Sequence, residues 1–155
     1  FNIGQDTYDR QKIYDTIFNK YGHIDKNLTP TEKVNEVLDK IRFNVVYDGG
    51  YLYANLDTAV KADRMVCWQV ARVTKILLED AGVEAECMVV NTTNNSGYHT
   101  LVRWKNENGR WVYTDPTYLI DLLASIEQKN DSYDIDSDTF NERYIPYNRC
   151  DVVSK

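Results

Sequence analysis

The segment from residue 66 to residue 115 changes its hydrophobic period along its length, and this limits the structures that it can form. Its first part has apolar side chains at helical spacing, and Gly82 follows as a stop signal. Alternating apolar and polar residues come next, and the sequence NENG at 106–109 is typical of a hairpin turn. The segment predicts, in this order, a helix at 66–80, a strand at 83–91 and two hairpin strands at 98–105 and 110–115.

Two further helices are predicted upstream. Residues 5–21 carry apolar side chains three and four positions apart, and Gly22 is a plausible stop. Thr29 is a suitable N-cap for a second amphipathic helix that continues to about residue 41, because Pro30 fits the first helical position and Glu32 has capping-box spacing. Between this helix and Cys67, the sequence predicts an extended stretch at 43–47, a turn at 48–50 and a loop or short helix at 51–65.

Length and charge narrow the class of protein. The chain has 155 residues, of which 43% are hydrophobic, and its formal net charge is −6. This describes one folded domain, 1–155, without an internal repeat or a linker. An acidic chain with no basic run argues against nucleic-acid binding and against an anionic membrane surface. No apolar run approaches the roughly 20 residues of a membrane-spanning helix, so we expect no membrane insertion.

The C-terminal part gives weaker signals. A short helix is expected near residue 118, and residues 134–142 are rich in aspartate. This acidic stretch lacks the glycine and the final glutamate of an EF-hand loop, so it is interpreted as a solvated loop. The widely spaced cysteines and the two histidines do not have zinc-site spacing, and we expect no metal and no cofactor.

Cys67, His99 and Asp115 form the candidate catalytic set. Cys67 begins the predicted helix, where free amides and the helix dipole lower the pKa of a thiol. His99 begins one strand of the hairpin, and Asp115 ends its partner strand. An imidazole can deprotonate a thiol, and a carboxylate can orient that imidazole, so this order of residues indicates a thiol nucleophile.

The turn type decides whether the histidine and the aspartate can meet. A three-residue loop at 107–109, with Gly109 left-handed, pairs Asn106 with Arg110. Counting back from that pair places His99 and Asp115 on the same face of the hairpin as diagonal neighbours. A four-residue loop would send them to opposite faces. The glycine at the end of NENG favours the shorter loop.

Each member of the set also has an ordinary interpretation. Cys67 alone would fit as a small packing residue, His99 as a structural strand residue, and Asp115 as the start of a turn before Pro116. All three together, in this order and on these elements, favour the catalytic interpretation. Cys87 faces the core side of its strand and is assigned to packing, and a disulfide between Cys87 and Cys150 stays open.

The chain resembles the transglutaminase-like superfamily in three stretches, VCWQVARVTKILLEDAGVEAECMVV at 66–90, YHTLVRW at 98–104 and GRWVYTDPT at 109–117. The resemblance extends more weakly to residue 34, so that the core motif region is 34–117. It implies a papain-like α+β core, with N-terminal helices on a small antiparallel sheet. It also implies a Cys67 nucleophile, a His99 base, an Asp115 orienter and a thioester intermediate made from an amide.

The resemblance leaves parts of the site open. The backbone amide of Cys67 is the expected first donor to the oxyanion, and Tyr47 is the candidate for the second donor. Trp68 is a candidate substrate-binding residue. A peptide or protein is the expected substrate, and hydrolysis is the leading reaction, as in a cysteine peptidase or amidase. Amine attack by a protein-glutamine transglutaminase is the alternative within the enzyme class, with an amine channel lined by Trp68, Trp104 or Trp111.

Two interpretations outside the enzyme class remain. The chain could be a catalytically inactive module that binds a peptide or protein, or a structural domain joined by a Cys87–Cys150 disulfide. A secreted or cell-surface bacterial location is expected from the resemblance and because the first residue is Phe1 and not a methionine. Oligomeric state has no signal in the sequence.

Overall fold

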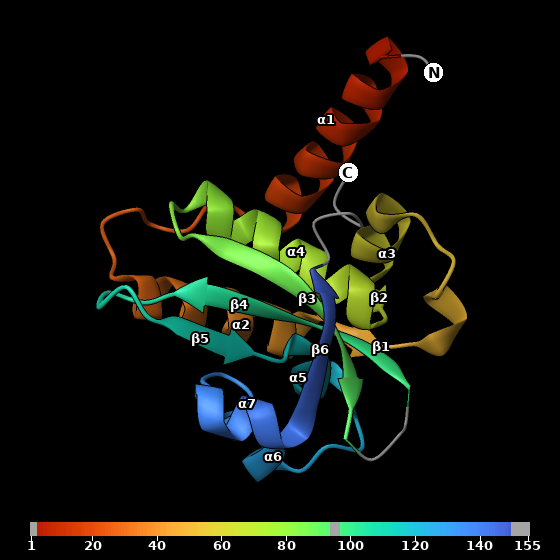
Figure 1. The fold of residues 1–155 in the computed structure, drawn as a ribbon. Coiled ribbons are helices and arrows are strands. Elements are labelled where there is room, and N and C mark those ends of the chain that lie inside the picture. Colours follow the sequence, from red (N-terminus) through yellow and green to blue (C-terminus); the bar gives the residue numbers. More distant parts are fainter. Residues whose placement is uncertain (1–2, 94–96, 150–155) are drawn as a thin grey trace.

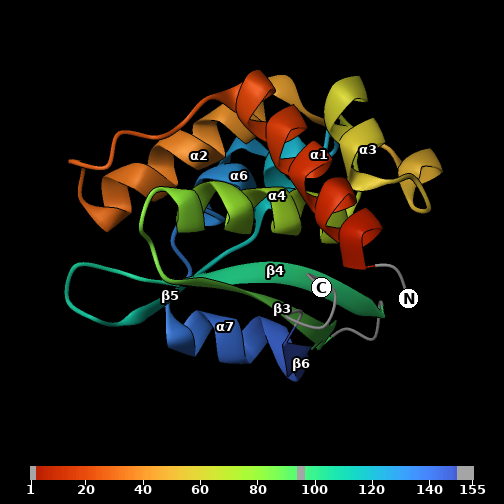
Figure 2. The ribbon, with the colours of Figure 1, turned by 90° about the horizontal axis from the view of Figure 1, so that it is seen from above.

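The structure of the chain, a computed structural model, describes residues 3–93 and 97–149, which form layers of helices around a sheet (Figure 1). Within these residues, four strands form an antiparallel sheet in the order β5-β4-β3-β6. Helices α1 to α4 lie on one face of this sheet, and α7 lies on the opposite face (Figure 2). The elements are α1 (Ile3–Tyr21), α2 (Pro30–Asn44), β1 (Val46–Tyr47), a 3-10 helix η1 (Gly49–Tyr51), α3 (Leu56–Ala62), β2 (Arg64–Met65), α4 (Cys67–Asp80), β3 (Ala85–Thr92), β4 (Tyr98–Lys105), β5 (Trp111–Thr114), α5 (Pro116–Ile120), α6 (Ile126–Asp131), α7 (Ser137–Arg143) and β6 (Tyr144–Arg149).

Helix α2 begins as predicted and is tied to the end of α4. The Thr29 hydroxyl accepts a hydrogen bond from the Glu32 amide at 3.2 Å, and the Glu32 carboxylate accepts one from the Thr29 amide at 3.0 Å. Lys33 is buried, and its ammonium donates to the Ala81 carbonyl at 2.7 Å. Since the last carbonyls of a helix lack intrahelical partners, this contact caps α4 with a positive charge.

Helix α4 packs its apolar face on the sheet and carries Cys67 at its first position. Val70, Val73 and Leu77 are at most 1% exposed, which confirms the buried face predicted from their spacing. Full burial of such side chains contributes about 1.5–3 kcal/mol each relative to exposure. Gly82 ends the helix with a φ of 87°, a left-handed conformation that glycine adopts without steric cost. The start of α4 is therefore held at a fixed place above the sheet.

The β4–β5 hairpin has the predicted register. Lys105 pairs with Trp111 and Val102 pairs with Thr114, which is the register of a three-residue loop. The Asn106 amide donates to the Arg110 carbonyl at 2.9 Å, and Gly109 has a φ of 73°. The left-handed glycine lets the short loop close, so the turn chemistry alone predicted which face each strand residue occupies.

The segment between α2 and α4 is more ordered than expected. Part of it is the short helix α3, which was one of the two expectations for 51–65. Of the extended stretch expected at 43–47, residues 43 and 44 instead continue α2, and Val46–Tyr47 form β1. The parallel pairing of Val46 and Tyr47 with Arg64 and Met65, the small β1–β2 ladder, was not predicted. A ladder of two residues is too short to show an alternating pattern in the sequence. Its pairing is set by the tertiary contacts around it. Because Tyr47 pairs with Met65, the ladder brings Tyr47 close to Cys67, which lies two residues after Met65.

The prediction of a solvated acidic loop at 134–142 was wrong. Asp136 caps α7 by accepting a hydrogen bond from the Thr139 amide at 2.7 Å, and Phe140 is 2% exposed. Strand β6 follows and pairs antiparallel with β3. A helix of seven residues is too short to show a convincing period. Burial of Phe140 against the sheet outweighs the polar composition of its neighbours.

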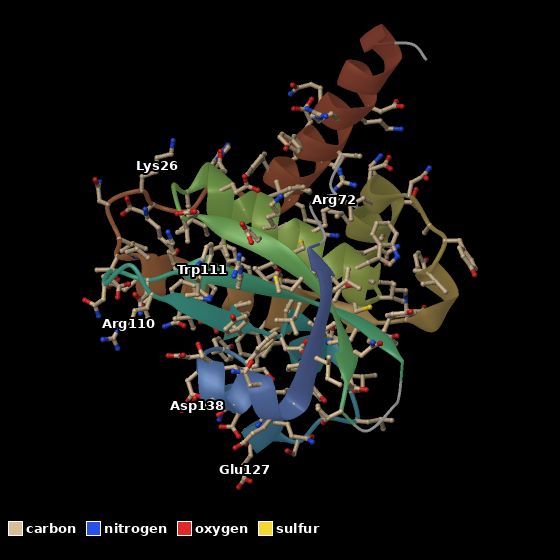
Figure 3. The ribbon with its side chains drawn as sticks, viewed as in Figure 1. Lys26, Arg72, Arg110, Trp111, Glu127 and Asp138 are labelled. Carbon is tan, nitrogen blue, oxygen red and sulfur yellow. The ribbon has the colours of Figure 1, made fainter. Side chains whose placement is uncertain are left out.

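Cysteines and surface residues complete the description. Cys87 is a free, fully buried thiol in β3, which confirms its assignment to packing. Its proposed partner Cys150 lies outside the described residues. The charged side chains of Arg110, Glu127 and Asp138 lie at the periphery of the molecule (Figure 3). In the portion of the chain that the structure describes, every helix falls short of the length and apolarity needed to cross a membrane.

Candidate active site

Cys67 is held at the start of α4 by a buried glutamine. The backbone at Val66 is extended, and its amide donates to the Gln69 side-chain oxygen at 2.8 Å. The Gln69 side-chain nitrogen donates in turn to the carbonyls of Tyr51 and Ala54, at 2.6 and 3.1 Å. Gln69 is 0% exposed, so these bonds are shielded from water. The side chain of Gln69 therefore joins the helix start to the loop before α3.

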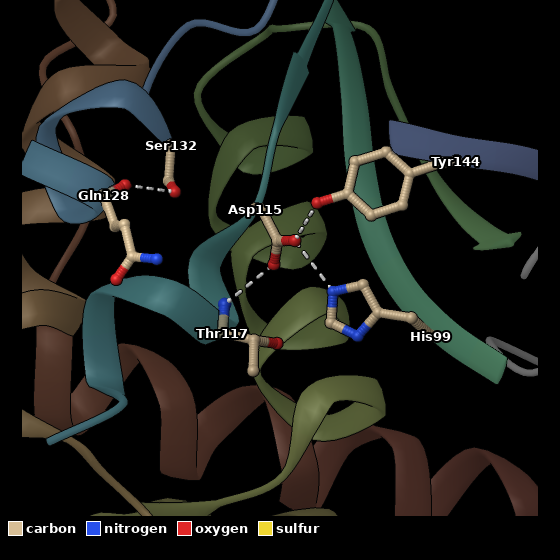
Figure 4. Close-up of polar contacts among 6 residues, drawn as sticks. All are labelled: His99, Asp115, Thr117, Gln128, Ser132 and Tyr144. Atoms are coloured by element: carbon tan, nitrogen blue, oxygen red, sulfur yellow. Dashed lines mark hydrogen bonds and ion pairs between the residues drawn. The ribbon is translucent and has the colours of Figure 1, made fainter. Parts of the chain in front are cut away.

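His99 and Asp115 meet as the hairpin register predicts. Asp115 follows β5 and is 0% exposed. The His99 Nε2 atom lies 2.8 Å from the Asp115 Oδ2 atom (Figure 4). This contact uses Nε2, which leaves the Nδ1 side of the ring for Cys67, whose thiol also hydrogen-bonds His99. The structure thus brings the three predicted residues into one chain of contacts.

Asp115 is fixed by more than its histidine. Its Oδ2 atom accepts a hydrogen bond from the Tyr144 hydroxyl at 2.7 Å, and its Oδ1 atom accepts one from the Thr117 amide at 3.2 Å (Figure 4). The Asp115 amide donates to the Ser132 carbonyl at 3.0 Å. A buried carboxylate is costly unless it is paired and hydrogen-bonded. Three donors to the Asp115 carboxylate meet that requirement: His99 and Tyr144 at Oδ2 and the Thr117 amide at Oδ1.

Tyr144 also covers the ring of His99. The two rings are nearly parallel, with an angle of 17° and centroids 6.0 Å apart. Tyr144 is 3% exposed and also packs against Phe140, with ring centroids 5.4 Å apart. Burial raises the pKa of its phenol, and the charge of Asp115 raises it further, so the hydroxyl stays protonated and donates. Sequence reasoning missed Tyr144, because its place depends on the pairing of β6 with β3.

The electrostatics favour a charged Cys67–His99 pair. Burial raises the pKa of the Cys67 thiol, but the hydrogen bond and charge of His99 and a hydrogen bond from the Thr100 backbone amide outweigh it, so the net pKa is lowered. Burial lowers the pKa of His99, but the charge and hydrogen bond of Asp115, followed by those of Cys67, raise it to about 10. Both shifts favour a thiolate on Cys67 beside an imidazolium on His99.

A cavity of about 370 Å³ opens at the thiol. It gives a reacting group access to Cys67 and His99 and is walled by tyrosines from four parts of the chain. Its lining residues are Tyr47, Cys67, Thr92, Gly97, Tyr98, His99, Thr117, Tyr118, Asp121 and Tyr144. The Thr117 side-chain oxygen is buried without a hydrogen-bond partner. Since an unpaired buried hydroxyl carries a cost, Thr117 is a candidate contact for a bound substrate.

Tyr47 lies in this cavity, whereas Trp68 does not. Burial raises the pKa of the Tyr47 phenol, and the charges of Cys67 and Asp121 add to the effect, so a neutral hydroxyl is available near the thiol. The Trp68 indole donates to the Leu52 carbonyl at 3.0 Å, and its ring lines a separate cavity with Tyr53 and Arg72. Neighbouring residues of a helix point about 100° apart, which separates Trp68 from Cys67.

The other two tryptophans lie away from the cavity. Trp104 is 2% exposed and donates from its indole to the Thr114 hydroxyl at 2.9 Å. Trp111 lies under the Arg103 guanidinium, 4.0 Å from the ring centroid, on the sheet surface (Figure 3). Among the described residues, the predicted amine channel therefore has no tryptophan wall.

Comparisons with known proteins agree with this architecture. Residues 10–116 match the family model described as the transglutaminase-like superfamily. A "Putative Cysteine Protease" from Cytophaga hutchinsonii is 21% identical over a region covering 71% of this chain, with a TM-score of 0.55. A protein described as a TGase is 15% identical and covers 76% of this chain, with a TM-score of 0.54. A comparison with curated proteins finds no match.

These likenesses show the fold. The chain spans 38% and 33% of the lengths of the two solved proteins, so it corresponds to one part of each. The expected papain-like transglutaminase core, with helices packed on a small antiparallel sheet, is confirmed.

Proposed function

This chain belongs to the transglutaminase-like superfamily, and we propose that it is a thiol enzyme that acts on peptide or protein amides through a thioester on Cys67. One observation carries the proposal. A thiol of lowered pKa, a histidine of raised pKa and a buried carboxylate lie in contact beside an open cavity. A structural thiol has no need of such a partner set, since buried structural cysteines are inert.

The first half of the reaction forms the thioester. The Cys67 thiolate attacks the carbonyl carbon of the amide, and the carbonyl oxygen becomes an oxyanion. The Cys67 amide and the Tyr47 hydroxyl are the proposed donors to this oxyanion. The His99 imidazolium gives its proton to the departing nitrogen, the C–N bond breaks, and the amine leaves. Asp115 keeps the imidazole in the orientation that this transfer needs.

The second half releases the acid. Neutral His99 takes a proton from a water molecule, and the hydroxide attacks the thioester carbon. The C–S bond breaks, so a carboxylic acid leaves and the Cys67 thiolate is restored beside a protonated His99. Hydrolysis is our leading reaction because water needs no dedicated amine site, and the cavity at Cys67 is open and walled by polar and tyrosine side chains.

Cross-linking by amine attack is the alternative within this chemistry. It needs a site that favours a lysine amine over water, and none of the three tryptophans lines the Cys67 cavity within the described residues. A peptide-binding module without turnover is the alternative outside it. The lowered pKa of Cys67 and the raised pKa of His99 argue against that module, because binding alone does not require a charged thiolate.

A peptide library incubated in heavy-oxygen water tests the proposal. Hydrolysis places one heavy oxygen in each new carboxylate, whereas amine attack in the presence of a dansylated primary amine adds the dansyl group and no heavy oxygen. We expect heavy-oxygen products from the wild-type protein and none from Cys67→Ala. Arg110→Gln, at the exposed hairpin tip, is the matched control and is expected to retain activity. Turnover by Cys67→Ala would refute the nucleophile.

A secreted or cell-surface bacterial setting is part of the proposal. One of the solved relatives comes from Cytophaga hutchinsonii, which supports a bacterial setting. Detection of the protein in the culture medium or on intact cells, against a cytoplasmic marker, tests the location.

A further inference from the structure

A second cavity, of about 340 Å³, adjoins the cavity at Cys67. Thr92, Tyr118 and Tyr144 line both cavities, so these side chains form the boundary between them. A substrate held at Cys67 therefore has a neighbouring space to enter on the Tyr144 side. The proposed reaction uses no group from that space.

The second cavity contains an arginine at its wall. Arg143 is the last residue of α7, and its position is set by a hydrogen bond from the Thr93 amide to its carbonyl at 3.0 Å. No carboxylate among the described residues lies within 4.0 Å of its guanidinium nitrogens, in contrast to Arg64 and Arg103. The guanidinium of Arg143 is thus available to a ligand.

The charge of Arg143 acts at the boundary between the two cavities. Burial raises the pKa of the Tyr118 phenol and the charge of Asp115 adds to this, while the Arg143 charge acts in the opposite direction. The Tyr144 phenol experiences the same opposing influence from Arg143, behind larger effects of burial and Asp115. Arg143 therefore lies close to both tyrosines that separate its cavity from Cys67.

The rest of the lining is polar. Two threonines, Thr92 at the end of β3 and Thr93 in its continuation, line the cavity. The Gln128 side-chain oxygen is engaged by the Ser125 amide at 2.9 Å, so its nitrogen is the end left to donate. Asp131 is exposed and adds one acceptor. The cavity thus combines several donors and one cation with a single carboxylate.

We infer that this second cavity is a subsite for a substrate carboxylate. Arg143 binds the carboxylate, and Asp131 accepts a hydrogen bond from the substrate N–H next to it. A peptide C-terminus has both features within one residue. Planar, bidentate pairing with a carboxylate is the contact for which a guanidinium is suited. The inference rests on the proposed function for the substrate at Cys67, but the carboxylate site itself is testable without turnover.

The first test uses reagents that label Cys67. Iodoacetyl-glycine peptides with one to three glycines carry a carboxylate roughly 3.5–10 Å beyond the reactive carbon, at about 3.5 Å per extended residue. Each acid is compared with its C-terminal amide, which has the same length and no charge. We expect one acid of the series to label Cys67 about five- to tenfold faster than its amide, equivalent to about 1–1.4 kcal/mol.

Variants assign this preference to Arg143. In Arg143→Gln the ratio of the acid rate to the amide rate is expected to fall to about one. Arg110→Gln removes another exposed arginine, one that does not line the cavity, and is expected to keep the wild-type ratio. Added salt should lower the wild-type ratio, since partly exposed charges are screened. Equal acid and amide rates throughout the wild-type series, with Cys67 still reacting fast, would overturn the subsite and leave the proposed function standing.

The second test does not depend on the thiol. N-acetyl-glycylglycine and its amide are titrated into Cys67→Ala, and the arginine side-chain N–H signals are followed by NMR. The Arg143 signal is identified by its loss in Arg143→Gln. We expect the acid to shift this signal and the amide to leave it in place. An Arg143 signal that neither compound shifts would refute carboxylate binding, whatever the reactivity of Cys67.

Discussion

Replacing Tyr144 with phenylalanine tests how Asp115 is held. The change removes one hydroxyl and keeps the ring that stacks on His99 and contacts Phe140. That hydroxyl donates to the Asp115 carboxylate at 2.7 Å, and both residues are buried. Hydrogen bonds to charged groups contribute about 1.5–3 kcal/mol, so we expect the free energy of unfolding to fall by about that amount.

Tyr113 provides the matched control for this experiment. Its ring stacks on Phe140 with centroids 3.9 Å apart, in the same apolar cluster as Tyr144, whereas the tyrosine hydroxyl that donates to the Asp115 carboxylate is that of Tyr144. Tyr113→Phe should change the free energy of unfolding by less than about 0.5 kcal/mol, as most substitutions away from buried networks do. Urea unfolding at about pH 7 measures both variants, and the difference between them isolates the bond to Asp115.

A second readout separates an effect on the site from an effect on stability. The charge of Asp115 raises the pKa of the Cys67 thiol, and the Tyr144 hydroxyl shares that charge. Without the hydroxyl, the charge acts more strongly on Cys67, so the alkylation profile of Cys67 should move to higher pH. The movement should be less than about one pH unit, because one unit would need about 1.4 kcal/mol transmitted to the thiol. The reasoning is refuted if Tyr144→Phe matches Tyr113→Phe in both stability and profile.

Three other changes have defined outcomes. In a Cys67→Ala background, which removes the thiol and its part of the shift, Asp115 should still hold the pKa of His99 above its ordinary value of about 6.5. This raised pKa should stabilise the fold fully below about pH 6.5 and lose its effect as pH rises through it, so the stability gap to His99→Gln should narrow over that window in urea unfolding; a constant gap would contradict it. Gly109→Ala should lower the free energy of unfolding by about 1 kcal/mol. A Cβ would meet no neighbour there, so the cost comes from the φ of 73°, which is strained for alanine; an unchanged melting temperature would mean that the loop relaxes freely. Trp68→Phe should leave the rate of Cys67 alkylation within about twofold of wild type, since the Trp68 indole bonds Leu52 outside the Cys67 cavity, and a large loss of rate would place Trp68 in the site after all.

Local chemistry explains which parts of the site the sequence could predict. The register that joins His99 to Asp115 follows from one turn, in which Gly109 is left-handed and the Asn106 side-chain oxygen accepts the amides of Asn108 and Arg110. These signals lie within five consecutive residues. The position of Cys67 at a helix start is likewise a local property, set by the extended backbone of Val66 and by Gln69.

The missed residues depend on contacts between distant segments. Tyr144 reaches Asp115 from 29 residues away, and only the packing of α7 and β6 on the sheet brings it there. The acidic residues around Phe140 favour a loop in isolation, and burial of Phe140 reverses that preference. Trp68, the candidate substrate-binding residue, lines a separate cavity from Cys67. Its position directly after Cys67 turns it to another side of the helix, which helical geometry already indicates.

The central claim is that Cys67 is a thiolate paired with His99, and site-resolved alkylation tests it most directly. Iodoacetamide labelling is followed from about pH 4 to pH 10 by peptide mass spectrometry, with buried Cys87 as the internal control. We expect Cys67 to reach its full rate well below the pKa of about 8.5 of an ordinary thiol, and His99→Gln to move that profile to higher pH. A Cys67 profile centred at about 8.5, unchanged in His99→Gln, would contradict the nucleophile and the mechanism built on it.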